Sequence, residues 1–231
     1  MRARLPLARG ANQRWTRIAL ALTGLAIVGA SEAAAQRVVP VHLEPRHRQI
    51  RIEDDLKLLD VQIQPGDTTL HHTHAEPIMY TFISSGDGPS GGRVSSNTNY
   101  ATESYTHWVT NAGPNLFRII ALAHYGPAVD NATDRRPEGL AGEPQLENPW
   151  FRSYRLELGP GEQTGLIRHT NPAVIIQVTT GHTDVSNEEA HGADLVRMGD
   201  WTWREAGTGY RIRNAGSTPV SVVVNEGRRR D

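Results

Sequence analysis

The sequence predicts an all-β protein built from two tandem barrels or sandwiches. Short runs of β-branched, aromatic and aliphatic residues alternate with turns rich in Gly, Pro and Asn, and no long helical period interrupts them. The chain also repeats itself, with two related elements in the same order in each half. Repeated strands without intervening helices favour an all-β architecture.

The internal repeat rests on two matches. Residues 65–86 align without a gap to residues 160–181; both copies open with Pro-Gly, share Thr, His and Pro, and close on Gly after a strand-like run. Residues 107–113 then align to residues 210–216, and an apolar run follows each copy. Two related elements in the same order favour duplication over coincidence.

The repeat sets the expected domain boundaries. We expect an N-terminal barrel over residues 36–130, a linker over residues 131–149 and a C-terminal barrel over residues 150–231. The linker follows from its many Pro and Gly residues, which are typical of connections between compact units.

Residues 1–35 have the arrangement of a secretory signal. Several Arg residues precede an apolar run over residues 18–30, and Ala33, Ala34 and Ala35 form a small-residue cleavage site. The apolar run is about 13 residues long, short of the roughly 20 that a spanning helix needs, and no other stretch approaches that length. We therefore expect cleavage after Ala35, no membrane span in the mature chain, and a periplasmic or secreted location.

Composition narrows the functions that the chain can perform. The 231 residues contain 24 Lys plus Arg, 25 Asp plus Glu and no Cys, so a bound metal must be held by His, carboxylate or carbonyl groups. Without residues 1–35 the net charge is about −5, which argues against nucleic acid as a partner because phosphate binding needs a concentrated positive face. Sequence signatures of serine hydrolases, phosphate-binding loops and zinc-protease helices are absent.

A histidine cluster is the strongest functional signal. Side chains at positions i and i+2 of a strand share a face, so His72 and His74 converge while His71 turns away. His107, on a later strand, supplies a third imidazole by position. Three imidazoles on one face suit a divalent transition metal such as Fe, Mn, Ni, Cu or Zn. The alternative is a His-rich surface loop without a metal.

The spacing of these residues resembles the cupin superfamily. The first cupin motif is matched by Gly66, His72, His74 and Gly86, and the second by His107 and Asn111. The C-terminal half resembles the second motif through Gly199, Gly207 and Asn214, with Glu205 at the usual Pro and Tyr210 at the usual His. The resemblance covers most of the mature chain. It implies a bicupin, with two tandem cupin-type β-barrels of the double-stranded β-helix or jelly-roll type, and it makes a homodimer an expectation.

The chain departs from the family pattern at one ligand position. In cupins a Glu commonly joins the three histidines, and its usual spacing falls at Ile78 or Met79; we assign the position to Met79 and expect that side chain to pack in the core. Glu76 is a substitute carboxylate because it shares the strand parity of the histidines, although Pro77 is expected to break the strand. Sets of three histidines without a carboxylate also occur among cupin-like dioxygenases.

The second repeat provides an internal comparison. Ile167 and Tyr210 stand where the first repeat has His72 and His107, so only His169 remains, too few ligands for a metal. The C-terminal barrel is therefore expected to bind none. The histidines without a partner pattern are expected to lie outside any site: His42, His47 and His124.

Three functions remain open. The first is an exported metalloenzyme, dioxygenase-like or acting as a Lewis acid on a small organic substrate in the N-terminal barrel; the ligands lie in one half only, which favours it. Proximity in sequence makes Glu76, Tyr80 and His71 the catalytic candidates. The second is a periplasmic protein that binds or senses a small molecule without catalysis. The third is a structural or assembly protein.

Overall fold

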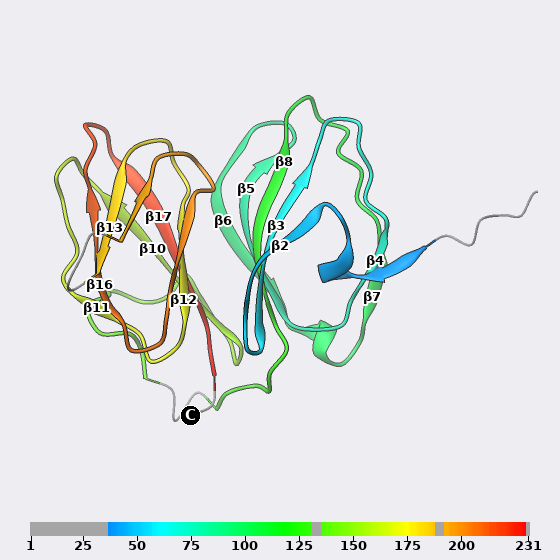
Figure 1. The fold of residues 1–231 in the computed structure, drawn as a ribbon, viewed down its shortest axis with the longest axis horizontal. Helices are drawn as coiled ribbons and strands as arrows, with labels where there is room; N and C mark the ends of the chain where they lie inside the picture. Colours follow the sequence, from blue (N-terminus) through cyan, green and yellow to red (C-terminus); the bar gives the residue numbers. More distant parts are fainter. Residues whose placement is uncertain (1–36, 131–134, 188–191, 230–231) are drawn as a thin grey trace, which may run out of the picture. The chain divides into compact units, whose positions relative to one another are not determined.

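A computed structural model describes residues 37–130, 135–187 and 192–229 of the chain (Figure 1). The expected signal peptide lies outside these residues, as does part of the expected linker. The described residues form strands β1 to β17 and two short 3-10 helices, η1 (Val41–Leu43) and η2 (Asn99–Ala101). No helix among them has the length and apolarity that crossing a membrane requires.

The N-terminal half of the described chain forms two sheets. The larger has the strand order β2-β3-β8-β5-β6, with bounds His47–Glu53, Leu56–Ile63, Phe117–His124, Ile78–Ser85 and Pro89–Asn97. The smaller has the order β1-β4-β7, with bounds Val38–Pro40, His71–His74 and Tyr105–His107. Strands β4 and β7 are antiparallel partners, and β1 pairs with β4 in parallel.

The C-terminal half also forms two sheets. The larger has the order β15-β12-β17-β10-β9, with bounds Trp201–Arg204, Ala173–Gln177, Val220–Gly227, Phe151–Leu158 and Leu146–Glu147. The smaller has the order β11-β16-β13-β14, with bounds Ile167–Arg168, Gly209–Asn214, Thr183–Asn187 and Ala193–Leu195. The all-β prediction is confirmed.

The sequence repeat is also a structural repeat. In the N-terminal half, β3 pairs with β8 so that Leu56 lies opposite His124; in the C-terminal half, β10 pairs with β17 so that Phe151 lies opposite Gly227. The turns agree as well. Gly66 and Gly161 both have φ of 77°, a left-handed conformation that glycine adopts without a steric penalty.

A buried asparagine closes the equivalent loop in each half. The Asn111 side-chain amide donates to the backbone carbonyls of Ile63 and Asn115, at 2.9 and 2.8 Å. The Asn214 amide makes the same two bonds, to Leu158 and Thr218, at 2.9 and 2.8 Å. This agreement explains why both asparagines belong to the repeated segment.

Three apolar clusters hold these sheets together. One fills the space between the two N-terminal sheets and a second fills the C-terminal pair. The third lies between the two five-stranded sheets. In the N-terminal sheet it is formed by the side chains that alternate with those facing the small sheet and therefore point the other way. It draws on both halves: Leu56, Leu58, Met79, Ile83, Ile120, Leu122, Phe151, Val174, Ile176, Val178, Trp203 and Val223. A buried bond from the Asn225 amide to the Thr81 hydroxyl, 2.8 Å long, crosses between the same sheets.

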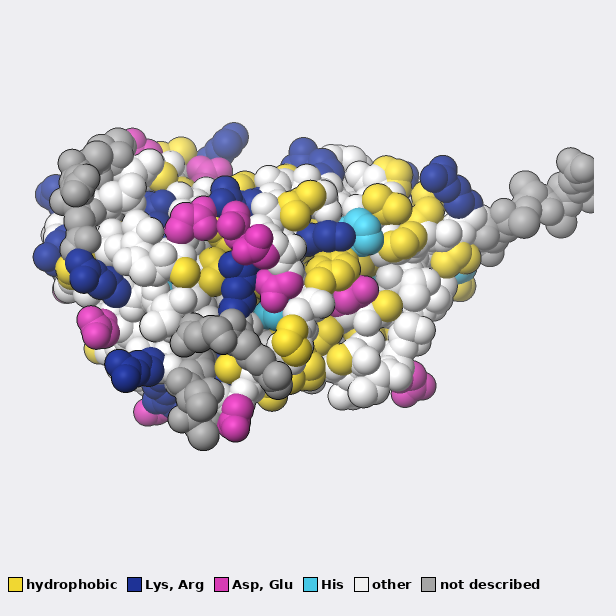
Figure 2. All heavy atoms as spheres, turned by 60° about the horizontal axis from the view of Figure 1, so that its bottom comes forward, with side chains coloured by type: hydrophobic (Ala, Val, Ile, Leu, Met, Phe, Trp, Pro, Cys, Tyr) yellow, Lys and Arg dark blue, Asp and Glu magenta, His cyan; other side chains and the backbone are white. Residues whose placement is uncertain are grey.

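Charged side chains of both signs are interspersed on the surface. On the face shown in Figure 2, Lys and Arg side chains lie beside Asp and Glu rather than in one basic patch. Arg229, for example, pairs with Asp54 at 3.2 Å and with Asp55 at 2.8 Å. That face lacks the concentrated positive charge that phosphate backbones require.

Candidate metal centre

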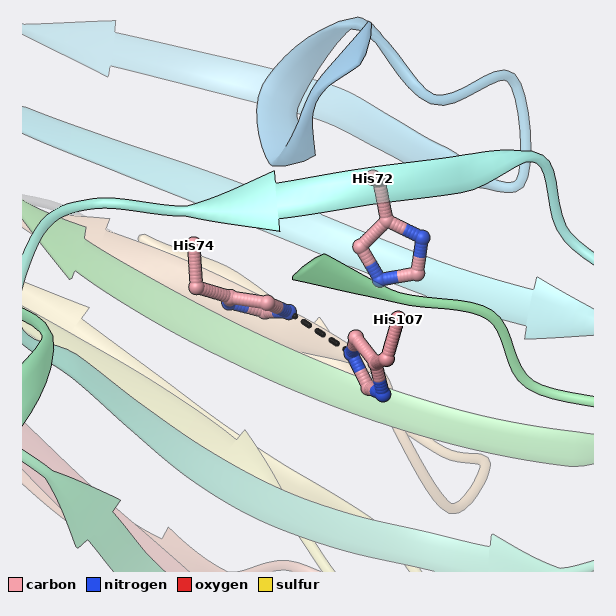
Figure 3. Close-up of side chains that lie close together, drawn as sticks. All are labelled: His72, His74 and His107. Atoms are coloured by element: carbon pink, nitrogen blue, oxygen red, sulfur yellow. Dashed lines mark hydrogen bonds between the residues drawn. The ribbon is translucent and has the colours of Figure 1, made fainter. Parts of the chain in front are cut away.

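The predicted histidines come together on the small N-terminal sheet. His72 and His74 lie on β4, His107 lies on β7, and the register places His72 directly opposite His107. Figure 3 shows the three rings turned toward one another. One nitrogen from each ring lies within 4.8 Å of the others, and no second such cluster of metal-ligating residues occurs in the described ranges.

The hydrogen bonds of His72 leave a ligand nitrogen free. Its Nδ1 lies 2.9 Å from the carbonyl oxygen of Leu70, so Nδ1 carries the proton and donates. Its Nε2 is therefore an acceptor, and this atom is buried without a hydrogen-bond partner. A buried lone pair without a partner is costly, and coordination would remove that cost.

His74 and His107 face each other edge to edge. Their Nε2 atoms are 3.1 Å apart, and Nδ1 of His74 is buried without a partner. The His74 ring stacks on Tyr100, with centroids 5.0 Å apart, which limits its rotation. A set of three neutral nitrogen donors fits a divalent transition metal, so the residues present are compatible with the metal that the sequence predicts.

Burial keeps these imidazoles uncharged at neutral pH. Desolvation lowers the pKa of His72 to about 4, and the hydrogen bond to Leu70 only partly opposes it. Desolvation also lowers the pKa of His74 to about 3, with His72 and His107 adding to the effect, and it lowers the pKa of His107. Uncharged rings are the form that binds a metal.

A fourth histidine lies at the site, contrary to the sequence-based expectation. His47 begins β2, and its ring centroid is 4.4 Å from that of His72. Its Nδ1 donates to Oε2 of Glu44 at 2.7 Å. The prediction that His47 lies outside any site is therefore wrong. The available signal was the spacing of Glu44 and His47, three residues apart at the start of a strand.

Glu44, the hydrogen-bond partner of His47, is held as an anion. Its carboxylate accepts backbone N–H bonds from Arg46, His47 and Leu70 at 2.6, 3.1 and 3.1 Å. Burial by itself would raise the pKa of Glu44, but the bonds from His47 and the backbone outweigh it and lower the pKa to about 2. Because the Glu44 carboxylate accepts from Nδ1 of His47, the proton of His47 stays on that nitrogen. The opposite edge of the His47 ring faces the other histidines.

The inward-facing position that the sequence-based prediction assigns to Met79 is occupied by Ile78 instead. Ile78 lines the cavity at the histidines, whereas Met79 packs in the cluster between the two five-stranded sheets. The expectation that Met79 packs in the core therefore agrees with the structure, and its assignment to the inward position is corrected. Strand β4 ends at His74, so the parity of the histidines does not continue into β5.

Two of the three catalytic candidates, Glu76 and Tyr80, have different surroundings. Glu76 follows the end of β4 and lies outside the cavity lining; its charge acts on His42 and Tyr125 instead. Tyr80 does line the cavity. Burial raises its pKa, and a side-chain hydrogen bond with Tyr100 adds to that effect.

The cavity beside the histidines has a volume of about 200 Å³ and lies between the two N-terminal sheets. Its lining consists of imidazole, aromatic and aliphatic side chains: His47, Val61, Ile63, His72, His74, Ile78, Tyr80, Phe82, His107, Val109, Phe117, Ile119 and Ala121. His71 is not among them. Its ring packs against the exposed Trp108, with ring centroids 4.3 Å apart, and points away from the cavity as strand parity predicts.

The equivalent position in the C-terminal half holds a hydrogen-bonded network. Ile167 lies opposite Tyr210, as His72 lies opposite His107. His169 is buried, with Nδ1 2.5 Å from Oε1 of Glu226 and Nε2 2.6 Å from the Tyr210 hydroxyl. Both of its ring nitrogens are engaged, so His169 presents no spare donor atom.

The sequence matches no family model and no curated protein. Among solved structures, AerE from Microcystis aeruginosa has 9% identity and a TM-score of 0.50, covering 80% of this chain and 99% of its own. A salicylate 1,2-dioxygenase mutant from Pseudoaminobacter salicylatoxidans has 11% identity and a TM-score of 0.52, covering 75% and 71%. A cupin 2 conserved barrel domain protein from Leptotrichia buccalis has 11% identity and a TM-score of 0.48, covering 78% and 87%. Identities this low show the fold alone, and the described chain has an all-β fold of the cupin-barrel type.

Proposed function

We propose that the chain is an exported metal-binding bicupin, a metalloenzyme that acts on a small organic substrate in its N-terminal half. The observation that carries the proposal is the buried Nε2 of His72, which has no partner and faces two further imidazoles at the end of a cavity. Three histidines on a rigid sheet and an adjoining cavity are the parts that such a site needs.

The chain's own residues would hold and orient the metal. His72, His74 and His107 would be the ligands, and the Leu70 carbonyl fixes the ring of His72 through Nδ1. When bound, a divalent Fe, Mn, Ni, Cu or Zn ion would supply Lewis acidity or, for the redox-active metals, reactivity toward O₂. The apolar cavity wall would exclude water from the substrate.

Export and domain division are part of the same proposal. The Arg-rich start, the apolar run and the small-residue site of residues 1–35 support a periplasmic or secreted protein cleaved after Ala35. The repeated hydrogen bonds at Asn111 and Asn214 support two tandem cupin barrels, with residues 131–149 between them. The homodimer stays a prediction from the family resemblance.

One observation favours a second candidate, a protein that binds or senses a small molecule without catalysis. No Asp or Glu side chain lines the cavity, so the lining offers no carboxylate as a general base. In this case the cavity would serve as a ligand pocket, with a metal in a structural role or none.

Metal content tests the site on which the enzyme proposal depends. The chain would be purified without a histidine tag and analysed by elemental mass spectrometry, beside His72→Ala, His74→Ala and His107→Ala variants. We expect about one metal equivalent in the wild type and a loss in each variant. His71→Ala is the matched control, because that ring lies on the other face of β4, and it should keep the metal.

The outcome that contradicts the enzyme proposal is equally specific. A folded wild type that holds no metal after reconstitution with Fe, Mn, Ni, Cu and Zn would leave ligand binding without catalysis as the function of the cavity. Circular dichroism of each variant establishes that a lost metal is not a lost fold.

A further inference from the structure

Apart from the Tyr80 hydroxyl, the polar side-chain atoms that line the cavity in the N-terminal half lie on one side. His47, His72, His74 and His107 supply all the ring nitrogens in the lining, and they come from β2, β4 and β7. The opposite wall is built from alternate side chains of β3, β5 and β8, which point inward by strand parity. A ligand in this cavity therefore meets two different chemical surfaces.

The opposite wall has no charged group to offer. Its members are Val61, Ile63, Ile78, Tyr80, Phe82, Phe117, Ile119 and Ala121. The only hydroxyl among them, on Tyr80, is engaged with Tyr100. A ligand carboxylate or phosphate placed here would be buried without a hydrogen-bond donor or a cation, which is strongly unfavourable.

The neighbouring arginines do not add a positive charge to this wall. Arg46, close to His47 in sequence, donates to Asp67 from Nε at 2.7 Å and from a terminal nitrogen at 2.6 Å. The Arg93 guanidinium lies 4.2 Å from the centroid of the Phe82 ring, but Arg93 is exposed and does not line the cavity. The guanidinium groups near the cavity thus lie outside its lining.

The volume sets the size of the occupant. A dry protein cavity of about 150 Å³ holds benzene, which has six non-hydrogen atoms. The cavity here, about 200 Å³, accordingly suits a body of about eight non-hydrogen atoms. The lining disfavours sugars and nucleotides, because their hydroxyl and phosphate groups require many hydrogen bonds that its apolar side does not supply.

We propose that the ligand of this cavity is a small molecule with an apolar body of about eight non-hydrogen atoms and a polar group at one end only, the end that meets the histidines. Molecules with a charged group at both ends, or at the end away from the histidines, are rejected. This inference deepens the proposed function by naming its substrate class, and it rests on the same site.

Two isosteric probes test the charge at the far end. 5-Methyl-1-hexanol and 5-hydroxypentanoate have the same chain and hydroxyl group, and differ in an isopropyl group against a carboxylate of the same shape. Binding to the full chain would be measured by calorimetry, first without metal and then with Zn²⁺. We expect the alcohol to bind at least tenfold more tightly than the carboxylate in both forms.

A charge placed in the apolar wall should change this preference. Phe117 lines the cavity and is only half-buried, so Phe117→Lys adds a cation there with little risk to the fold. This variant should narrow or reverse the preference for the alcohol, whereas Phe117→Leu should keep it. Val38→Lys, at an exposed position on β1, adds the same charge outside the cavity and should behave as the wild type.

Two results overturn the inference. One is a wild type that binds the carboxylate as tightly as the alcohol or more tightly. The other is a wild type that binds neither probe although it takes up metal normally. Because the first arm uses metal-free protein, failure of the ligand class is distinguishable from failure of the metal site, which elemental analysis reports separately.

Discussion

His72 and His107 are cross-strand partners, one on β4 and the other directly opposite on β7. Their separation is therefore set by the spacing of paired strands and not by a loop. His74 follows two residues after His72 on the same face of β4. A metal site built this way exists before the metal arrives, which lowers the cost of assembling it.

Stability of the metal-free protein should fall as the pH drops below about 6.5. In the unfolded chain His72 and His74 have their ordinary pKa of 6.5, but in the fold these values are lowered to about 4 and about 3. Between these values the unfolded state binds protons that the folded state does not, so acid favours unfolding. Urea unfolding at a series of pH values should show this slope, and His72→Ala should reduce it. An unchanged slope in the variant would contradict the assignment.

Glu44 should stabilise the protein through the hydrogen bonds that its carboxylate accepts. Glu44→Ala leaves several buried donors unpaired, at about 1–3 kcal/mol for each unsatisfied group, so we expect a loss on the order of 3 kcal/mol in the free energy of unfolding. Glu44→Gln keeps an acceptor oxygen and should lose less. Because the pKa of Glu44 is lowered from 4.5 to about 2, its stabilisation is present above pH 4.5 and is lost as the pH falls toward 2. Denaturant curves at pH values on both sides of this window measure it: wild type and Glu44→Gln should converge in acid, whereas equal stabilities above pH 4.5 would contradict the prediction.

Met79→Ala should reduce stability without affecting the metal. The side chain is 1% exposed and packs between the two five-stranded sheets, so truncation leaves a cavity and should cost about 2–5 kcal/mol. Met79→Leu nearly conserves volume and should cost less than about 1.5 kcal/mol. Chemical denaturation measures the loss, and elemental analysis should find an unchanged metal equivalent. A loss of metal in folded Met79→Leu would show that the thioether acts as a ligand after all.

We expect His169 to be unnecessary for metal binding but important for the stability of the fold. Tyr210→Phe removes the hydroxyl that donates to Nε2 of His169, which leaves a buried acceptor unpaired and should cost about 1–3 kcal/mol. Metal content should stay at the wild-type value in both Tyr210→Phe and His169→Ala. If His169→Ala halved the metal content, a second site in the C-terminal half would have to be assigned.

Sequence periodicity predicted the parts of the site that depend on a single strand. The alternation of side chains placed His72 and His74 together and turned His71 away, and the position of His107 in the second cupin-like motif named it as the third imidazole. These conclusions needed only local geometry and the resemblance to the cupin motifs.

The errors lie where the chain leaves a strand. A bend and Pro77 separate β4 from β5, so counting parity from the histidines does not show which of Ile78 and Met79 points inward. His47 was missed because it reaches the site through tertiary packing of β2 and through its bond to Glu44. Both faces of the five-stranded sheet are apolar, so the pattern of its strands does not reveal which residues face the other half.

The apolar cluster between the two five-stranded sheets has the character of a symmetric dimer contact within one chain. Equivalent positions of the two repeats meet in it: Leu56 corresponds to Phe151, Met79 to Val174, and Ile120 to Val223. A self-complementary contact of this kind is the usual outcome of two-fold pairing between identical subunits. Because one polypeptide carries both partners, their effective concentration is set by the connecting segment, and the contact persists at any dilution of the protein. The two halves should accordingly unfold in a single cooperative transition.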